Sequence, residues 1–124
     1  TIFFTFWGLF PLVRDDVRIT GTNAMTKALA AMNRPGMSHM KLSKLQMAGA
    51  GSWMMKKLAA DQKVSSPTEL IEMCRELDVN LWPCEMTMEL LGLRRDQLIE
   101  GVGEPVGAAT ALSEMSKSQI NLFI

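Results

Sequence analysis

The chain has 124 residues, 13 basic and 13 acidic side chains, and a hydrophobic content of 48%. This length suits one domain with a single core, and the apolar content excludes a disordered or collagen-like chain. A net charge of zero argues against purely electrostatic binding of nucleic acid. Two cysteines cannot form a disulfide scaffold, so we expect a reducing, cytoplasmic setting.

The first thirteen residues, TIFFTFWGLFPLV, are strongly apolar. They lack the basic start and small-residue end of a signal peptide, and they fall short of the ~20 apolar residues that span a bilayer. We expect Ile2–Phe6 to form a buried strand that ends at Trp7-Gly8. Leu9–Arg14 then begins a helix, with Pro11 tolerated only in its first turn.

Charge is unevenly distributed along the chain. Residues 17–60 contain no Asp or Glu but seven basic residues, the only histidine and seven of the eleven methionines. The rest of the chain holds six basic and thirteen acidic residues, so the two parts carry +7 and −7. Because Met is flexible and polarizable, the segment suits a contact surface for a partner protein or a membrane. The alternative is a solvated basic face whose methionines fill gaps in the core.

The middle of the chain combines helical patterns with one irregular stretch. Ala24–Met32 is a good helix former and must end before Pro35-Gly36. Gly36–Gly51 has no clear hydrophobic period, and we predict a mobile lid over residues 34–51. Trp53–Ala60 is a second predicted helix.

The clearest local signal is the capping box Ser66-Pro67-Thr68-Glu69, which predicts a helix over Pro67–Leu77. Cys74 lies on the apolar stripe of this helix, which favours a packing role. The remaining predictions are a strand at Val79–Pro83, helical segments at Thr87–Leu91, Arg95–Glu100 and Gly107–Ser116, a short strand or extended loop at Gly101–Val106, and a buried last strand at Asn121–Ile124. Short strands that alternate with helices indicate an α/β fold with a mainly parallel sheet.

Sites in an open parallel sheet lie outside the carboxyl ends of the strands. Three segments meet that condition, namely Phe6-Trp7-Gly8, Cys84-Glu85-Met86 and Val106-Gly107-Ala108, and only the second carries a nucleophile. A thiol that precedes a helix faces free backbone N–H groups, which favour the reactive thiolate. The alternative is that Cys84 is a small buried core residue.

Other reaction classes are poorly supported. The sequence has no glycine-rich nucleotide-binding fingerprint and no GxSxG motif, and one histidine with two scattered cysteines makes no zinc site. We therefore expect neither a cofactor nor a metal. His39 is either a loop residue or a base for Cys84, and a redox pair of Cys74 with Cys84 requires Cα atoms within ~7 Å.

Four segments resemble the DsrE/DsrF-like family, in particular its peroxiredoxin-associated, DsrE-only branch. They are TIFFTFWGL, LSKLQMAGAGSWMMKK, ELDVNLWPCEMTMELLGL and the end GVGEPVGAATAL…INLFI. The order of a strand, Cys84, Thr87-Met88 and Leu91-Gly92 follows a pattern of that family.

The resemblance implies one domain over residues 1–124, a three-layer α/β sandwich around a small, mainly parallel sheet. It also implies a sulfur carrier or sulfurtransferase that holds sulfane sulfur as a persulfide on Cys84. Its expected partners are a TusA-like carrier or a rhodanese, together with further copies of the chain in a homo-oligomer, and a peripheral membrane contact stays open. The residues expected to line the site are Trp7, Gly8, Met47, Gly49, Thr87, Met88 and Gly107, and those expected to form a basic lid are His39, Lys41 and Lys44. The competing hypothesis is a non-catalytic module that docks a protein or membrane through the basic, Met-rich residues 17–60.

Lys41 and Lys44 provide a test of the predicted lid, because no acidic residue lies near them in the sequence. Replacing both with Gln should slow sulfur transfer to an acidic carrier and flatten its salt dependence, since steering between charges weakens as salt rises. Stopped-flow transfer rates at several ionic strengths measure this. The melting temperature should stay nearly unchanged, and a wild-type rate at low salt would refute the lid.

Overall fold

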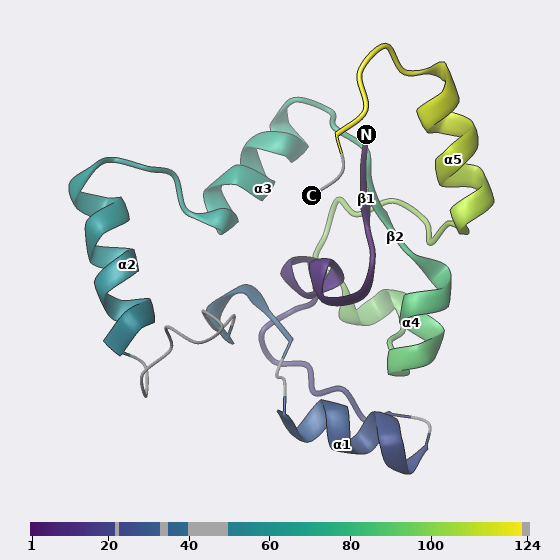
Figure 1. Ribbon diagram of the computed structural model, residues 1–124, viewed down its shortest axis with the longest axis horizontal. Coiled ribbons are helices and arrows are strands. Elements are labelled where there is room, and N and C mark those ends of the chain that lie inside the picture. Colours follow the sequence, from purple (N-terminus) through teal and green to yellow (C-terminus); the bar gives the residue numbers. More distant parts are fainter. Residues whose placement is uncertain (22, 33–34, 40–49, 123–124) are drawn as a thin grey trace.

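The computed structural model describes residues 1–21, 23–32, 35–39 and 50–122. Its centre is a pair of parallel strands, β1 (Ile2–Phe4) and β2 (Leu81–Pro83), in which Ile2 lies opposite Leu81 and Phe4 opposite Pro83. Helix α3 (Pro67–Glu76) lies to one side of the strands, and α4 (Glu85–Leu91) and α5 (Ala108–Lys117) lie to the other (Figure 1). This arrangement confirms a single-domain α/β fold with a small parallel sheet.

An extended segment after Gly101 continues the hydrogen-bonding pattern of β2. Gly103 N–H donates to the Leu81 carbonyl at 2.9 Å, and Val106 N–H donates to the Pro83 carbonyl at 3.0 Å. Cys84 and Val106 form a parallel bridge. The segment predicted as a short strand or extended loop therefore lies along β2, which places β2 between β1 and residues 103–106.

The core is built on the turn that follows β1. Residues Phe6–Leu12 form a 3₁₀ helix, η1, whose Leu9 and Leu12 are fully buried. The predicted helix at Leu9–Arg14 thus begins three residues earlier and ends at Leu12, and the prediction that Pro11 is tolerated only in a first turn is wrong. Pro11 lies near the end of η1. Proline has no backbone N–H, and a short 3₁₀ helix contains few internal hydrogen bonds for it to interrupt. Packed around η1 are Val13, Val17, Ile19, Leu81, Met88, Leu91, Leu93, Leu98 and Val102.

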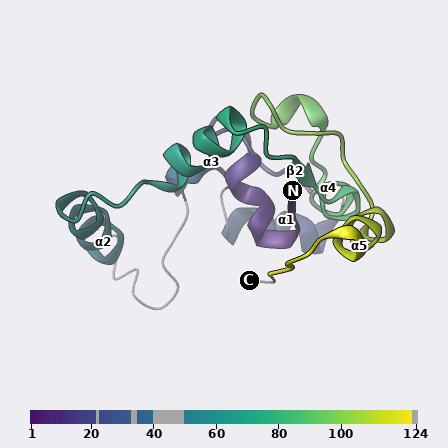
Figure 2. The ribbon, with the colours of Figure 1, turned by 90° about the horizontal axis from the view of Figure 1, so that it is seen from above.

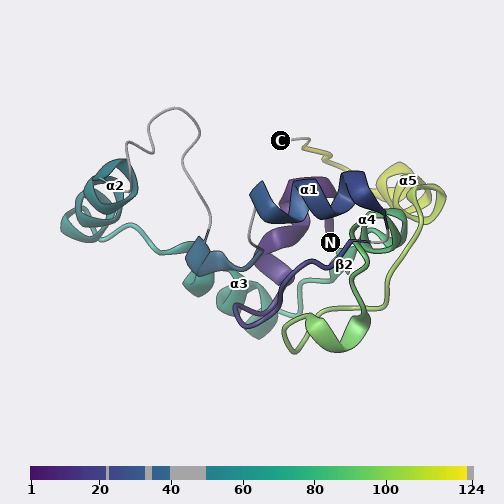
Figure 3. The same cartoon turned by 90° about the horizontal axis from the view of Figure 1, so that it is seen from below.

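Helix α1 (Ala24–Met32) has the predicted bounds. Asn23 caps it reciprocally with Thr26, because Thr26 N–H donates to Asn23 Oδ1 and Asn23 N–H donates to Thr26 Oγ1, each at 3.0 Å. Helix α1 contacts α4, and the two lie side by side in Figure 3. The capping box was not recognised in the sequence because Thr stands where Glu or Gln is usual.

The predicted lid at 34–51 falls mostly outside the described residues. Within it, Met37–His39 form a short 3₁₀ turn, η2, which contacts η1. Ala50 and Gly51 already belong to α2 (Ala50–Asp61), so the predicted helix at Trp53–Ala60 begins earlier than expected. Lys41, Lys44, Met47 and Gly49 lie outside the described residues.

The second half of the chain follows its local signals closely. The Ser66 side chain accepts from Glu69 N–H, the Glu69 carboxylate accepts from Ser66 N–H, and α3 runs over Pro67–Glu76. Gly92 ends α4 in the left-handed conformation at φ 66°, directly after the predicted helix end at Leu91. A 3₁₀ turn, η4 (Arg95–Gln97), stands where a helical turn over Arg95–Glu100 was predicted.

The prediction of a buried last strand at Asn121–Ile124 is wrong for its described part. Leu122 is 78% exposed, and residues 121–122 belong to no strand. The Asn121 amide donates instead to the Met115 carbonyl at 3.0 Å. This bond folds the segment back onto the end of α5, and residues 123–124 lie outside the described part of the chain. None of the helices in the described ranges is both long and apolar enough to cross a bilayer.

The capping box of α3 gives a stability test. Ser66→Ala should lower the free energy of unfolding by about 1 kcal/mol, because Glu69 N–H loses its acceptor. Urea denaturation measures the change. Ser65→Ala, at the exposed neighbouring position, is the matched control and should stay within about 0.5 kcal/mol of the wild type.

Candidate functional site

Cys84 lies where β2 ends and α4 begins. Its N–H donates to the Phe4 carbonyl of β1 at 2.9 Å, and its carbonyl accepts from Met88 N–H at 3.0 Å. The next residue, Glu85, donates its N–H to the Val106 carbonyl at 3.1 Å. Backbone bonds to β1, to α4 and to the 103–106 segment therefore fix the position of Cys84, which is 8% exposed and free of disulfide.

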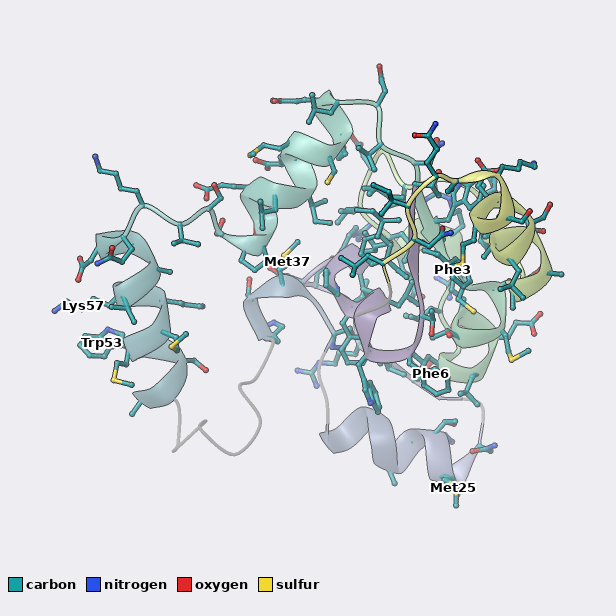
Figure 4. The ribbon with its side chains drawn as sticks, turned by 45° about the horizontal axis from the view of Figure 1, so that its top comes forward. Phe3, Phe6, Met25, Met37, Trp53 and Lys57 are labelled. Carbon is teal, nitrogen blue, oxygen red and sulfur yellow. The ribbon has the colours of Figure 1, made fainter. Side chains whose placement is uncertain are left out.

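The turn after β1 is attached to α4 close to Cys84. Phe6 N–H donates to the Thr87 hydroxyl at 3.1 Å, and Thr87 is 3% exposed. Phe6 adopts φ 46°, a conformation that bulky side chains rarely take. The hydrogen bond holds this turn at the sheet edge, and Figure 4 shows Phe6 at the turn below β1.

Aromatic rings and small residues surround this edge. Phe6 is 59% exposed and Trp7 is 47% exposed, and the Trp7 ring meets Phe10 edge to face with centroids 5.3 Å apart. A Cβ atom built at Gly8 or at Gly107 would meet nothing within 4 Å. The strand ends therefore leave open space beside an exposed aromatic turn.

The charges nearest to Cys84 in the chain have mixed effects. The start of a helix favours a nearby anion, but the first N–H of α4, that of Glu85, already donates to the Val106 carbonyl. Glu85 also places an exposed carboxylate in the same first turn. The resolved ion pairs belong to other segments. Hydrogen bonds from Arg14 lower the pKa of Asp16, and those from Arg94 lower the pKa of Asp96. Both pairs are exposed and contribute little to stability.

The structure brings together all three segments singled out in the sequence, two after strands and the third after the extended residues 103–106. Phe6 is bonded to Thr87, Cys84 bridges Val106, and Gly107 is the N-cap of α5. Met88 is buried in the core, one turn along α4 from Cys84. Cys74 is half-buried and packs against the core, as its place on the apolar stripe predicts.

His39 belongs to a different part of the described structure. It ends η2, where Ser38 N–H donates to Asp15 Oδ1 at 3.2 Å and the Ser38 hydroxyl also bonds to Asp15. These bonds attach η2 to the segment after η1 rather than to α4. They also give the Asp15 carboxylate a partner 23 positions away in the sequence.

A cleft between α2 and α3 lies apart from the cysteine site. It is lined by both helices, the linker between them and η2, including Met37, Lys56, Lys63 and Glu69. None of its lining residues belongs to the strand ends around Cys84. Over the described ranges, no cluster of three or more His, Cys, Asp or Glu side chains could hold a metal ion.

Sequence reasoning missed the Phe6–Thr87 bond. A positive φ at Phe6 cannot be read from its residue type, and the two partners are 81 positions apart. The only available signal was that both residues adjoin predicted strand ends.

Fold and site together define a small α/β protein with one cysteine at the carboxyl edge of a parallel sheet. The chain belongs to the DsrE/DsrF/DrsH-like family, whose model matches residues 1–123. It is 36% identical over 124 residues to the uncharacterized protein YrkE of Bacillus subtilis (strain 168), which covers 100% of this chain and 77% of YrkE. It is 31% identical over 126 residues to the sulfur carrier protein DsrE2 of Allochromatium vinosum, covering 99% of this chain and 77% of that protein.

The hydrogen bond between Phe6 and Thr87 predicts the effect of two substitutions. Thr87→Val keeps the side-chain shape but leaves Phe6 N–H without its acceptor, and should cost about 1–3 kcal/mol of stability. Thr87→Ser keeps the hydroxyl and should cost less. Urea denaturation of both variants checks this order, and equal losses would show that the bond adds nothing to stability.

Proposed function

We propose that this protein is a sulfur carrier that holds sulfane sulfur as a persulfide on Cys84. The single observation that carries the proposal is the position of that thiol, where the ends of β1 and β2 meet the 103–106 segment in a chain of this family. The relative named as a sulfur carrier supports the same role. Cys74 is less suited to it, because it packs against the core from the last turn of α3, away from the sheet edge.

The proposed reaction is an exchange between sulfur atoms. The Cys84 thiolate attacks the terminal sulfur of a donor persulfide, the donor's S–S bond breaks, and a new S–S bond forms on Cys84. The donor leaves as a thiolate and takes up a proton, so the exchange has no net oxidation or reduction. Transfer onward repeats these steps with an acceptor thiol.

Burial and an open edge suit the two demands of a carrier. A persulfide must be protected from reaction with other thiols. Burial provides that protection at Cys84, which is 8% exposed. It must also meet its partner, and the space at Gly8 and Gly107 together with the exposed Phe6 and Trp7 leaves room for a partner's loop. We propose a TusA-like or rhodanese-like protein as that partner, with residues 34–51 as a lid and the chain in a homo-oligomer.

A docking module is a second candidate, and one observation favours it. Met25, Trp53 and Met54, all within the acid-free segment, are 77%, 66% and 60% exposed. Such a module binds its partner through this surface without using the thiol. Its affinity for a partner would be unchanged by Cys84→Ser, whereas a carrier with that substitution would lose sulfur transfer entirely.

Mass spectrometry tests the carrier directly. Treatment with polysulfide should add about 32 Da to Cys84 in the wild type and in Cys74→Ser, and nothing at position 84 in Cys84→Ser. Sulfur on Cys74 alone would contradict the assignment.

A further inference from the structure

Helix α2 stands apart from the rest of the protein. Figures 2 and 3 show it at one end of the molecule, beyond α3. Only Gly51 is buried along its length. Its large apolar side chains are all largely exposed, at 66% for Trp53, 60% for Met54, 45% for Met55 and 53% for Leu58. A helix with this much exposed apolar surface gains little stabilisation from packing against its own chain.

The exposed side chains of α2 have a definite arrangement. At helical spacing, Met54, Met55 and Leu58 share one face, and Trp53 and Lys57 lie together beside it. The Lys57 ammonium is 5.5 Å from the centre of the Trp53 ring, and Figure 4 shows both side chains directed away from the core. Residues 50–63 carry three lysines and one aspartate, a net charge of +2 (three minus one).

Helix α3 presents a matching face of opposite charge. Its Ile71 and Cys74 pack against the core. A second, exposed apolar stripe is formed by Leu70, Met73 and the C-cap residue Leu77, which are 48%, 43% and 75% exposed. Glu72 and Glu76 border that stripe at helical spacing. Residues 67–76 carry three glutamates and one arginine, a net charge of −2 (one minus three).

The two stripes do not cover each other within one chain. The cleft lined by Lys56, Lys63 and Glu69 separates the facing sides of α2 and α3, and the apolar stripes of both helices stay open to solvent. Both helices therefore offer an apolar stripe with a charged border, one basic and the other acidic.

We infer that α2 of one copy of this protein packs on α3 of a second copy. Each copy carries both halves, so the two contacts are equivalent by a twofold axis and close a dimer. The apolar stripe of α2 packs on the apolar stripe of the second copy's α3. The lysines at positions 57 and 63 then face the glutamates at positions 72 and 76. A stable interface buries about 800 Å² per partner, and the twofold arrangement doubles the apolar surface that a single helix pair would bury. The inference deepens the proposed homo-oligomer and rests on it, but not on the sulfur chemistry of Cys84.

Charge reversal on each helix tests the interface. Lys57→Glu/Lys63→Glu changes residues 50–63 from +2 to −2, since each substitution shifts the charge by two, and Glu72→Lys/Glu76→Lys changes residues 67–76 from −2 to +2. Each double variant then has like charges on both faces and should raise the dimer dissociation constant roughly tenfold or more. Sedimentation velocity at low salt measures this. Lys27→Glu on α1, exposed and distant in sequence, is the control and should leave the dimer intact.

The decisive measurement mixes the two double variants. In a mixed dimer every contact again joins opposite charges, so an equimolar mixture should associate although neither variant does so alone. Circular dichroism of each variant establishes that it is folded. The inference is overturned if the wild type is a monomer at micromolar concentration, if either variant dimerises as the wild type does, or if the mixture stays monomeric. Sulfur loading of Cys84, measured by mass in the same samples, should be unchanged, so a failure of the interface is distinguished from a failure of the carrier proposal.

Discussion

The backbone bonds at Cys84 are the constraint on which the rest of the structure depends. One peptide N–H reaches the Phe4 carbonyl, and the next reaches the Val106 carbonyl. These two bonds join segments that are 80 and 21 positions apart in the sequence. Closing such long loops costs conformational entropy before any packing is gained. The buried Leu9, Leu12 and Leu81 offset that cost, because the paired strands bring them into one core.

The same bonds explain how the backbone at Cys84 is fixed in position while the edge of the sheet beside it stays accessible to a partner. Position 84 is the last residue before α4, so its backbone belongs to the sheet and to the helix at once. The side chain is buried, while Gly8 and Gly107, at the ends of the neighbouring segments, have open space around them. The strained Phe6 is kept in place by Thr87, one turn along α4 from the cysteine. Because the turn and the thiol are attached to the same short helix, a shift of α4 would move them together.

Local signals in the sequence predicted local structure well, and failures arose where distant contacts decide. The Ser66 capping box, the helix over Ala24–Met32 and the helix end at Leu91 all depend on residues within one or two turns, and all are confirmed. The apolar end of the chain looked like a strand, but strands need partners, and Asn121 bonds to α5 instead. The sequence also predicted that Cys84 follows a strand and that the segments at Phe6 and Val106 lie beside it, as the structure has them. It could not show that Phe6 takes a left-handed conformation, because the acceptor that stabilises it comes from Thr87.

The charge asymmetry of the sequence also takes a physical form in the structure. Residues 17–60 contain no Asp or Glu. Their basic side chains therefore either stay unpaired or contact carboxylates from distant parts of the sequence. In α2 they lie on a helix that stands apart from the core (Figure 1), with the Lys57 ammonium over the Trp53 ring. In α3 the glutamates lie on a helix whose other side is fixed to the core. The basic stripe of α2 favours association with an acidic apolar surface, and the acidic stripe of α3 favours association with a basic one. Each copy of the chain supplies both surfaces for another copy. Such an interface would involve α2 and α3 and leave the edge around Cys84 uncovered, so that assembly and sulfur exchange use different faces of the same small protein.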